Sequence, residues 1–235
     1  MRLYGRNCVT ERVKNNPKSI RKILLEATAD IAGLEHAIKS RHIPIERISK
    51  QEFNKKSQDI PSQGVIAEVS DFEYFYLEDI LALEKLPVIL FLDSLNDPQN
   101  LGSILRTAAC FGGFAIVLPK HDSVDVTEAV LRVAQGGENY VPVVKAVNLA
   151  IAIEKAKKKG FWIAGAVVGG GQDITKTALN FPLGIVIGSE HKGIRPGLMS
   201  HLDFNLTLPM EGAGLSFNAA TATALFCYEA VRQRQ

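Results

Sequence analysis

Three glycine-containing stretches in the last third of the chain hold residue types that could form a ligand site. Each follows an apolar run: residues 185–187 lead into Gly188-Ser189-Glu190, residues 204–208 lead into Pro209, and residues 212–218 lead into a helix. Apolar strands that end in glycine-rich loops form ligand crevices at the carboxyl edge of a sheet. The sequence therefore predicts a crevice for a small molecule between these three loops.

A polar helix start further upstream could supply reacting groups. It reads LDSLNDPQNLGSILRTA, in which Asp97-Pro98 forces an extended or turn geometry, so we expect Asn100 to cap the helix that follows. Arg106 falls between the apolar positions of that helix and should project outward. It is either an exposed helix arginine or an arginine held beside the crevice, where its guanidinium could fork onto a phosphate.

Other chemistries are excluded by the spacing of the residues. The cluster Gly169-Gly170-Gly171 lacks the GxGxxG pattern, and GSEHKGI lacks the eight-residue frame of a phosphate loop. Cys8, Cys110 and Cys227 are an odd number without metal-like spacing. We therefore expect no metal site, and we expect the cysteines to be packing residues in a reducing compartment.

The composition is that of a globular protein with a basic front end. The 235 residues are 46% hydrophobic and 22% charged. No apolar run approaches the roughly 18–20 residues of a membrane helix, and the N-terminus lacks the apolar core of a signal peptide, so a cytoplasmic location is predicted. Residues 1–60 hold 13 Lys and Arg against 7 Asp and Glu. This excess indicates either contact with a polyanion or an ordinary solvated surface.

The elements that must position these residues fall into two α/β parts. In the first part the pattern predicts a helix over 1–15, a strand over 20–27, a helix over 30–40, a strand over 44–48, a helix capped by Ser49 and Glu52, and a strand from Val65. We predict a small domain over 1–78 and a linker over 79–87. The linker's apolar residues should dock on a neighbour. A second domain is predicted over 88–235.

Strands and helices alternate in the second part. The predicted strands lie at VILFLD, FAIVLP, VPVVKA, FWIAGAV, LGIVIG and FNLTLP. The predicted helices cover residues 100–111, 126–134, 149–159 and 217–232. This alternation predicts an α/β fold with a mostly parallel sheet and helices on both of its faces.

The motifs that contain the candidate residues resemble those of a known family. NDPQNLGSILRTA, GIVIGSEHKGI and LPMEGAGLSFNAATATALFCYEAVRQ have the order and spacing of the three motifs of the SpoU/TrmH-type RNA ribose 2′-O-methyltransferases. YGRNCVTERV and PSQGVIAEV are similar to the small L30e-like substrate-binding domain that many members carry. The resemblance implies a trefoil-knotted C-terminal domain of the SPOUT class, S-adenosylmethionine as cofactor and a homodimer.

The resemblance also assigns roles to single residues. The catalytic positions are Asn100, Arg106, Glu190, Ser216 and Asn218. The cofactor-binding positions are Gly188, Leu208, Phe217, Val167, Gly193 and Met210. In this family the first-motif arginine faces the cofactor at the subunit interface, so Arg106 is expected there.

The expected chemistry suits these residue types. A ribose hydroxyl must lose its proton as it attacks a sulfonium methyl group in line. Because a guanidinium is a very poor base, Arg106 is expected to clamp an RNA phosphate and assist proton transfer, although it could also take the proton itself. The third motif departs from the usual SLNVS: Phe217 replaces the leucine and Ala220 the second serine. The loss of that hydroxyl is compatible with reduced activity.

The resulting hypothesis is S-adenosylmethionine-dependent 2′-O-methylation of a ribose in structured RNA, with a guanosine of 23S-type rRNA favoured. The L30e-like front end favours rRNA over tRNA, and its basic residues would hold the RNA backbone. A tRNA ribose methyltransferase is one alternative. A non-catalytic RNA-binding or ribosome-assembly protein that retains the fold is another, motivated by Ala220. A small-molecule enzyme with a different nucleotide cofactor is the third.

Overall fold

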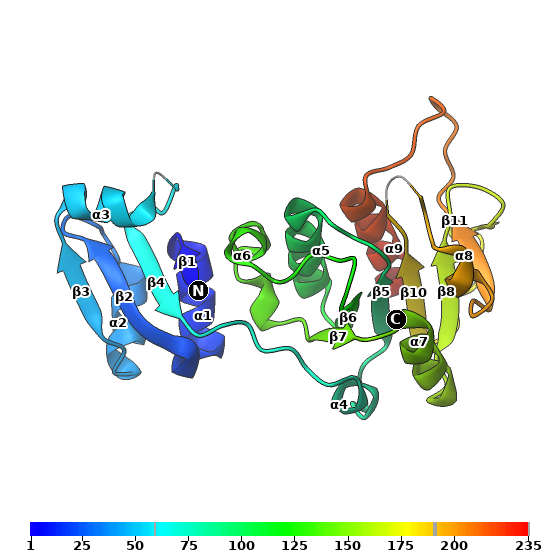
Figure 1. Cartoon of the computed structure of the whole chain (residues 1–235), viewed down its shortest axis with the longest axis horizontal. Coiled ribbons are helices and arrows are strands. Elements are labelled where there is room, and N and C mark those ends of the chain that lie inside the picture. Colours follow the sequence, from blue (N-terminus) through cyan, green and yellow to red (C-terminus); the bar gives the residue numbers. More distant parts are fainter. Residues whose placement is uncertain (59, 190–191, 235) are drawn as a thin grey trace.

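The computed structural model describes residues 1–58, 60–189 and 192–234, and it contains two β-sheets. Figure 1 shows the small sheet and its helices at one end of the molecule and the large sheet at the other, with α6 between them. The segment after the small sheet runs along one side of the molecule into the large sheet. The structure shows two sheets but does not fix the residue at which the first domain ends, so the domain bounds 1–78 and 88–235 stay a prediction.

The small sheet has the order β1-β4-β2-β3. Its pairs are antiparallel except for the parallel pair of β2 with β3. Its elements are β1 (Arg2–Tyr4), α1 (Arg6–Asn15), η1 (Pro17–Ser19), β2 (Ile20–Glu26), α2 (Ala32–Ser40), β3 (Ile45–Ile48), α3 (Lys50–Ser57) and β4 (Val65–Val69). The Ser49 hydroxyl accepts a hydrogen bond from the Glu52 amide, as the cap pattern predicts.

The expectation of one helix over residues 1–15 is wrong at its start. Arg2–Tyr4 forms β1 because Leu3 and Tyr4 are buried against β4, where the strand completes an antiparallel edge. Gly5 then separates the strand from α1 with a φ of 92°, a backbone conformation that glycine adopts without strain. Three residues of strand are too short to be recognised by alternation alone.

The large sheet has the order β7-β6-β5-β10-β8-β11-β9, and all of its pairs are parallel. The expected parallel α/β sheet is therefore confirmed. Its strands are β5 (Val88–Leu92), β6 (Phe114–Pro119), β7 (Val143–Ala146), β8 (Trp162–Ala166), β9 (Gln172–Asp173), β10 (Leu183–Ile187) and β11 (Phe204–Thr207). The two-residue strand β9 was not predicted.

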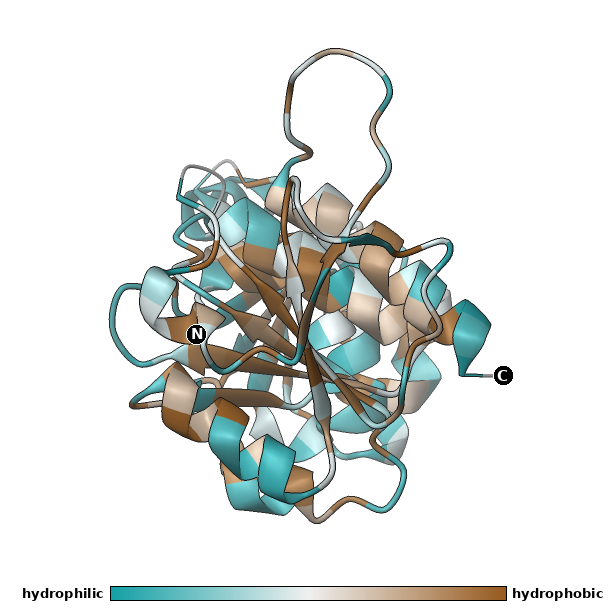
Figure 2. Cartoon of the chain, turned by 90° about the vertical axis from the view of Figure 1, so that its right-hand side faces the viewer, coloured by the Kyte–Doolittle hydropathy of each residue, from teal (hydrophilic) through white to brown (hydrophobic). Residues whose placement is uncertain are grey.

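Helices cover both faces of the large sheet, as the alternation predicts. The described helices of this part are α4 (Leu77–Leu81), α5 (Pro98–Phe111), α6 (Glu128–Ala134), η2 (Gly137–Asn139), α7 (Leu149–Lys158), α8 (Pro196–Met199) and α9 (Ala219–Gln233). Successive strand residues point to opposite faces, so Leu90 packs with α5, α6 and α9, whereas Phe91 packs with α4, α7 and α8. Figure 2 shows the strands as the apolar interior, with more polar residues on the helices outside.

The predicted linker, residues 79–87, overlaps a short helix. Leu77 and Ile80 of α4 and Leu86 after it are buried in the apolar cluster that α7 forms with the sheet. The expectation that this segment docks on a neighbour is therefore met. The segment packs against the protein because its apolar side chains would otherwise be exposed to water.

The helix α5 begins earlier than its sequence suggests. The Asp97 carboxylate accepts a hydrogen bond of 2.8 Å from the Gln99 amide and caps the helix, and Pro98 is its first residue. Asn100 is therefore not the cap, and it lies in the first turn with only 6% of its surface exposed. The Asn100 side chain therefore lies in the interior, where its amide can form a hydrogen bond with another side chain.

Candidate active site

A cavity of about 550 Å³ opens at the carboxyl ends of β8, β10 and β11. Its described lining residues are Ala166, Val167, Val168, Ile187, Gly188, Ser189, Lys192, Gly193, Ile194, Pro196, Met199, Leu208, Met210, Ser216, Phe217, Ala219, Ala222 and Phe226. Of these, only Lys192 carries a charge, and most of the others are apolar. The cavity is therefore suited to a mostly apolar ligand that is oriented by a few polar groups.

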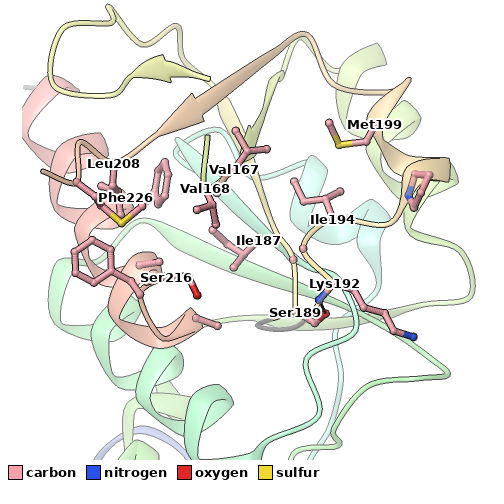
Figure 3. A pocket seen from close by; sticks show the side chains of 18 residues that line it. Val167, Val168, Ile187, Ser189, Lys192, Ile194, Met199, Leu208, Ser216 and Phe226 are labelled. Atoms are coloured by element: carbon pink, nitrogen blue, oxygen red, sulfur yellow. Dashed lines mark hydrogen bonds between the residues drawn. The ribbon is translucent and has the colours of Figure 1, made fainter. Parts of the chain in front are cut away.

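Three strand ends and the helices α8 and α9 form the walls of this cavity (Figure 3). The side chains of Val167 and Val168, which follow β8, and of Ile187, at the end of β10, lie between Phe226 on α9 and Ile194. Lys192 extends from the edge of the cavity away from its centre (Figure 3). The position conforms to the rule that ligands bind outside the carboxyl ends of parallel strands.

A tight loop after β10 shapes one side of the cavity. Ser189 and Gly193 exchange backbone hydrogen bonds of 3.2 and 2.9 Å. A Cβ atom on Gly188 would lie 2.1 Å from the carbonyl carbon of Gly193 and 2.3 Å from the Ile194 nitrogen. Only glycine permits this approach, so the residue is required by the loop itself.

The structure brings the first and third motifs into direct contact. The Asn218 amide nitrogen donates to the Asn100 side-chain oxygen over 2.9 Å. The Asn218 oxygen accepts from the amides of Ala220 and Thr221, so the same residue caps α9. The helix α9 therefore begins at Ala219 and not at Phe217 as predicted, and Asn218 both caps it and joins it to α5.

The predicted cofactor positions are all found at the cavity: Gly188, Leu208, Phe217, Val167, Gly193 and Met210. The predicted catalytic residue Ser216 lines it too. Asn100 and Asn218 do not line the cavity, but Asn218 directly follows the lining residue Phe217 and is hydrogen-bonded to Asn100. Glu190 lies outside the described residues.

Arg106 is exposed, as its place in the helix predicts, but it is not among the residues that line this cavity. Six residues separate it from Asn100, which in an α-helix is about 9 Å along the axis and about two-thirds of a turn further round. It lines a different cleft, together with residues of α1 and the segment around η2. Within one chain, therefore, the predicted catalytic residues are divided between two places.

The sequence analysis missed an ion pair between the buried Asp93 and the partly exposed Arg195. Asp93, which follows β5, is fully buried and accepts bonds of 2.8 Å from the Arg195 amide and 2.6 Å from its Nε. Arg195 directly precedes α8, so the pair fixes the loop from β10 to the end of β5. The sequence does contain a signal for this pair: Asp93 ends the continuous apolar run VILFLD, and a buried carboxylate without a partner would be costly.

Cys8 and Cys227 are buried thiols and take no part in this chemistry. Burial raises the pKa of Cys8 to about 12, and burial raises that of Cys227 to about 12 as well. Both thiols are therefore protonated at neutral pH, and a protonated thiol is neither a nucleophile nor a metal ligand. Among the described residues, no group of three or more His, Cys, Asp or Glu side chains could hold a metal ion.

The described part of the chain also has no helix that is long and apolar enough to cross a bilayer. Fold and site together define an α/β protein with a cavity for a small ligand at a sheet edge and a second, smaller α/β unit beside it. Comparison with known proteins makes this class specific. The profile of the SpoU rRNA methylase family matches residues 87–228, and that of RNA 2′-O ribose methyltransferase substrate binding matches residues 2–75.

Individual relatives match over nearly the whole chain. The 23S rRNA (guanosine-2′-O-)-methyltransferase RlmB of Pseudomonas putida is 35% identical over 241 residues, which cover 100% of this chain and 97% of that enzyme. The chain belongs to the SpoU rRNA methylase family. The family expected from the three motifs is thereby confirmed.

Solved structures show the same fold. The SpoU methyltransferase AviRb of Streptomyces viridochromogenes, in complex with AdoMet, has a TM-score of 0.82 at 22% identity and covers 100% of this chain and 90% of its own. An AdoMet-bound rRNA methyltransferase of Sinorhizobium meliloti has a TM-score of 0.83 at 21% identity, with 100% and 87% covered. Both structures hold the cofactor that the motifs of this chain imply.

Proposed function

We propose that this protein transfers a methyl group from S-adenosylmethionine to the 2′-hydroxyl of a ribose in structured RNA, and that its substrate is a guanosine of 23S-type rRNA. The observation that supports this most strongly is the full-length similarity to a guanosine-2′-O-methyltransferase of 23S rRNA. The match of residues 2–75 to a substrate-binding unit supports RNA as the substrate.

The cavity at the ends of β8, β10 and β11 is the proposed cofactor site. Its volume of about 550 Å³ lies within the roughly 300–1,000 Å³ of small-molecule sites. Gly188 and Gly193 line the cavity without side chains, so a ligand can lie against the backbone of the loop, and the apolar side chains around Phe226 suit the faces of a purine. When bound, the cofactor supplies an electrophilic methyl group, and no metal is required for that transfer.

The protein's own residues would orient the ribose and move its proton. Arg106 is proposed to clamp the RNA phosphate beside the reacting ribose and to assist proton transfer, because a guanidinium holds a phosphate with two parallel hydrogen bonds. Asn100 and Asn218, joined over 2.9 Å, would fix the start of α9 and with it Ser216 at the cavity wall. Alignment of this kind is a large part of catalysis for an in-line displacement.

A homodimer is part of the proposal. Arg106 lies away from the cavity of its own chain, so an active site that contains both needs a second copy. The loop between β11 and α9 projects from the body of the protein (Figure 1). Leu215 and Phe217 in this loop are 75% and 43% exposed, and Tyr228 on α9 is 56% exposed. A partner subunit would cover these apolar side chains, and the trefoil knot of the family would lie in the same region.

The test is the transfer of labelled methyl from S-adenosylmethionine to an unmethylated 23S-type rRNA transcript, followed by mapping of the modified ribose. Incorporation at one 2′-hydroxyl is the expected result, and the Arg106→Ala variant should lose it. Tight RNA binding without any transfer would instead support the non-catalytic alternative. Light scattering that gives the mass of one chain would contradict the homodimer.

A further inference from the structure

A second cleft, of about 470 Å³, lies where the substrate-binding part meets the methylase part. One wall is α1, and the other is made by α5 and the segment from the end of α6 to Tyr140. Its described lining residues are Asn7, Thr10, Glu11, Lys14, Arg106, Ala109, Cys110, Ala134, Gln135, Gly136, Gly137 and Tyr140. We call it the Arg106 cleft. Its position places residues of the first part, on α1, beside the proposed catalytic arginine.

The chemistry of the Arg106 cleft suits a nucleotide. Three charged side chains line it, and Glu11 is already hydrogen-bonded to the Lys14 amine over 2.9 Å and to the Tyr140 hydroxyl. The charge that remains is therefore the positive charge of Arg106, for which a phosphate is the natural partner. Tyr140 is 53% exposed and offers an aromatic ring, and Asn7 is exposed and offers an amide. Aromatic rings stack on unpaired bases, and amides bond to base edges.

The walls of the cleft are held in place before any ligand arrives. Arg12 on α1 bonds to Glu138 on η2 over 3.1 Å, and the two side chains are only 7% and 0% exposed. Burial raises the pKa of Glu138, and the Arg12 guanidinium opposes that rise. A Cβ on Gly136 would lie 2.6 Å from the Glu11 Cβ, so the absence of a side chain there lets the walls approach. A preformed cleft binds its ligand without an ordering cost.

We propose that the Arg106 cleft binds the RNA nucleotide next to the one that is methylated, with its base stacked on Tyr140 and its edge against Asn7. The inference rests on the proposed function, in which Arg106 holds the phosphate beside the reacting ribose. Each phosphate links two nucleotides, so a phosphate held by Arg106 places the nucleotide on its other side at this cleft. The neighbour would thus be recognised outside the duplex, as sequence-specific RNA binding generally requires.

The experiment measures the affinity of unmethylated 23S-type rRNA transcript for the full chain, by filter binding at fixed salt with S-adenosylhomocysteine present. Tyr140→Ala is expected to raise the Kd about tenfold, the loss expected for one stacked base. Tyr140→Phe keeps the ring and should bind nearly as the wild type does. Tyr76→Ala removes a tyrosine that is 75% exposed outside the cleft and should change nothing. Equal affinity of Tyr140→Ala and wild type would overturn the proposal.

A second pair of variants tests the cleft independently, in case Tyr140→Ala does not fold. Lys14→Gln changes the opposite wall of the cleft, and Lys85→Gln is its control at an exposed position in the predicted linker. Lys14→Gln should bind RNA several-fold more weakly than Lys85→Gln, while both keep the affinity for S-adenosylhomocysteine measured by calorimetry. Equal RNA affinities of these two variants would count against the cleft.

These measurements do not depend on catalysis, so the two proposals fail separately. Wild-type protein that binds the transcript but transfers no methyl group would refute the proposed function, and the variants would still decide whether the cleft holds RNA. Once the methylated ribose is mapped, an RNA with an abasic residue beside it gives a sharper test. The missing base should weaken binding to wild type and leave binding to Tyr140→Ala unchanged, and equal losses in both would contradict stacking on Tyr140.

Discussion

The proposed cofactor cavity and the Arg106 cleft are built in opposite ways. The cavity is lined almost entirely by apolar side chains and glycine loops, all from residues 166–226. The cleft is lined mainly by polar groups and combines residues 7–14 with residues 106–140. The first shape follows from strands that end side by side in one sheet, whereas the second exists only because two separate parts pack together.

This difference in construction suits the different ligands proposed for the two sites. A cavity made by one sheet can hold a small ligand of constant structure, because its walls are set by backbone geometry. A cleft between two parts can be tuned to an RNA substrate by changes on either side. The glycines of the loop after β10 maintain the first site, and the Arg12–Glu138 pair maintains the second. Substitutions at each should therefore have separable effects.

The largest effect is expected from Glu138→Ala, which leaves the Arg12 guanidinium buried without its partner. Removing one member of a buried pair costs about 3–5 kcal/mol of unfolding free energy, measured by denaturant titration. The exposed pair of Glu78 with Lys155 provides the control, since Glu78→Ala should leave the unfolding midpoint unchanged. A small effect of Glu138→Ala would show that the cleft does not depend on this pair.

Arg106→Ala should reduce methyl transfer by about 10²- to 10³-fold, the effect of removing one preorganised charged donor. Binding of S-adenosylhomocysteine should change less than the rate, because the role proposed for Arg106 is to hold the RNA phosphate and not the cofactor. Arg106→Lys keeps the positive charge but cannot form two parallel hydrogen bonds to a phosphate, so its rate should lie between those of the wild type and Arg106→Ala. Full activity of the alanine variant would remove Arg106 from the mechanism and break the proposed link between the two sites.

Gly188→Ala tests the cavity alone. The added methyl group would meet the backbone of Gly193 at 2.1 Å, and forced shifts of this kind cost about 1–3 kcal/mol. The affinity for S-adenosylhomocysteine should fall about tenfold in calorimetry, while RNA binding at the Arg106 cleft is retained. Gly212→Ala is the matched control, since nothing lies within 4 Å of the added atom. Similar affinities of the two variants would contradict the assigned cofactor loop.

The smallest effect is expected for the difference between two helix-cap variants, at Asn218 and at Asn148. Asn218→Ala removes a helix cap and the bond to Asn100, together about 2 kcal/mol of unfolding free energy. Asn148 caps α7 in the same way, through bonds to the amides of Ala150 and Ile151. Asn148→Ala should therefore cost about 1 kcal/mol, the cap alone. The difference between the variants measures the contact of the first with the third motif, and equal losses would show that this contact stabilises nothing.

Much of this molecule could be predicted from local sequence patterns. The strand and helix alternation after Val88 and the cap at Ser49 depend on residues that are neighbours in the chain. The cap of α5 was misplaced because Asp97 and Asn100 are both good cap residues, and burial decides between them. The strand Arg2–Tyr4 was missed because its partner β4 lies more than 60 residues away.

The sequence by itself determined the sheet, the three glycine loops and therefore the cofactor cavity, because parallel strands bring their carboxyl ends together whatever else the chain does. Only the tertiary structure decided where Arg106 points and what stands opposite it. That choice depends on the packing of α1 against η2, through a buried pair whose members are 126 residues apart. Contacts over such distances are selected by burial and charge together, and neither leaves a periodic signal in the chain.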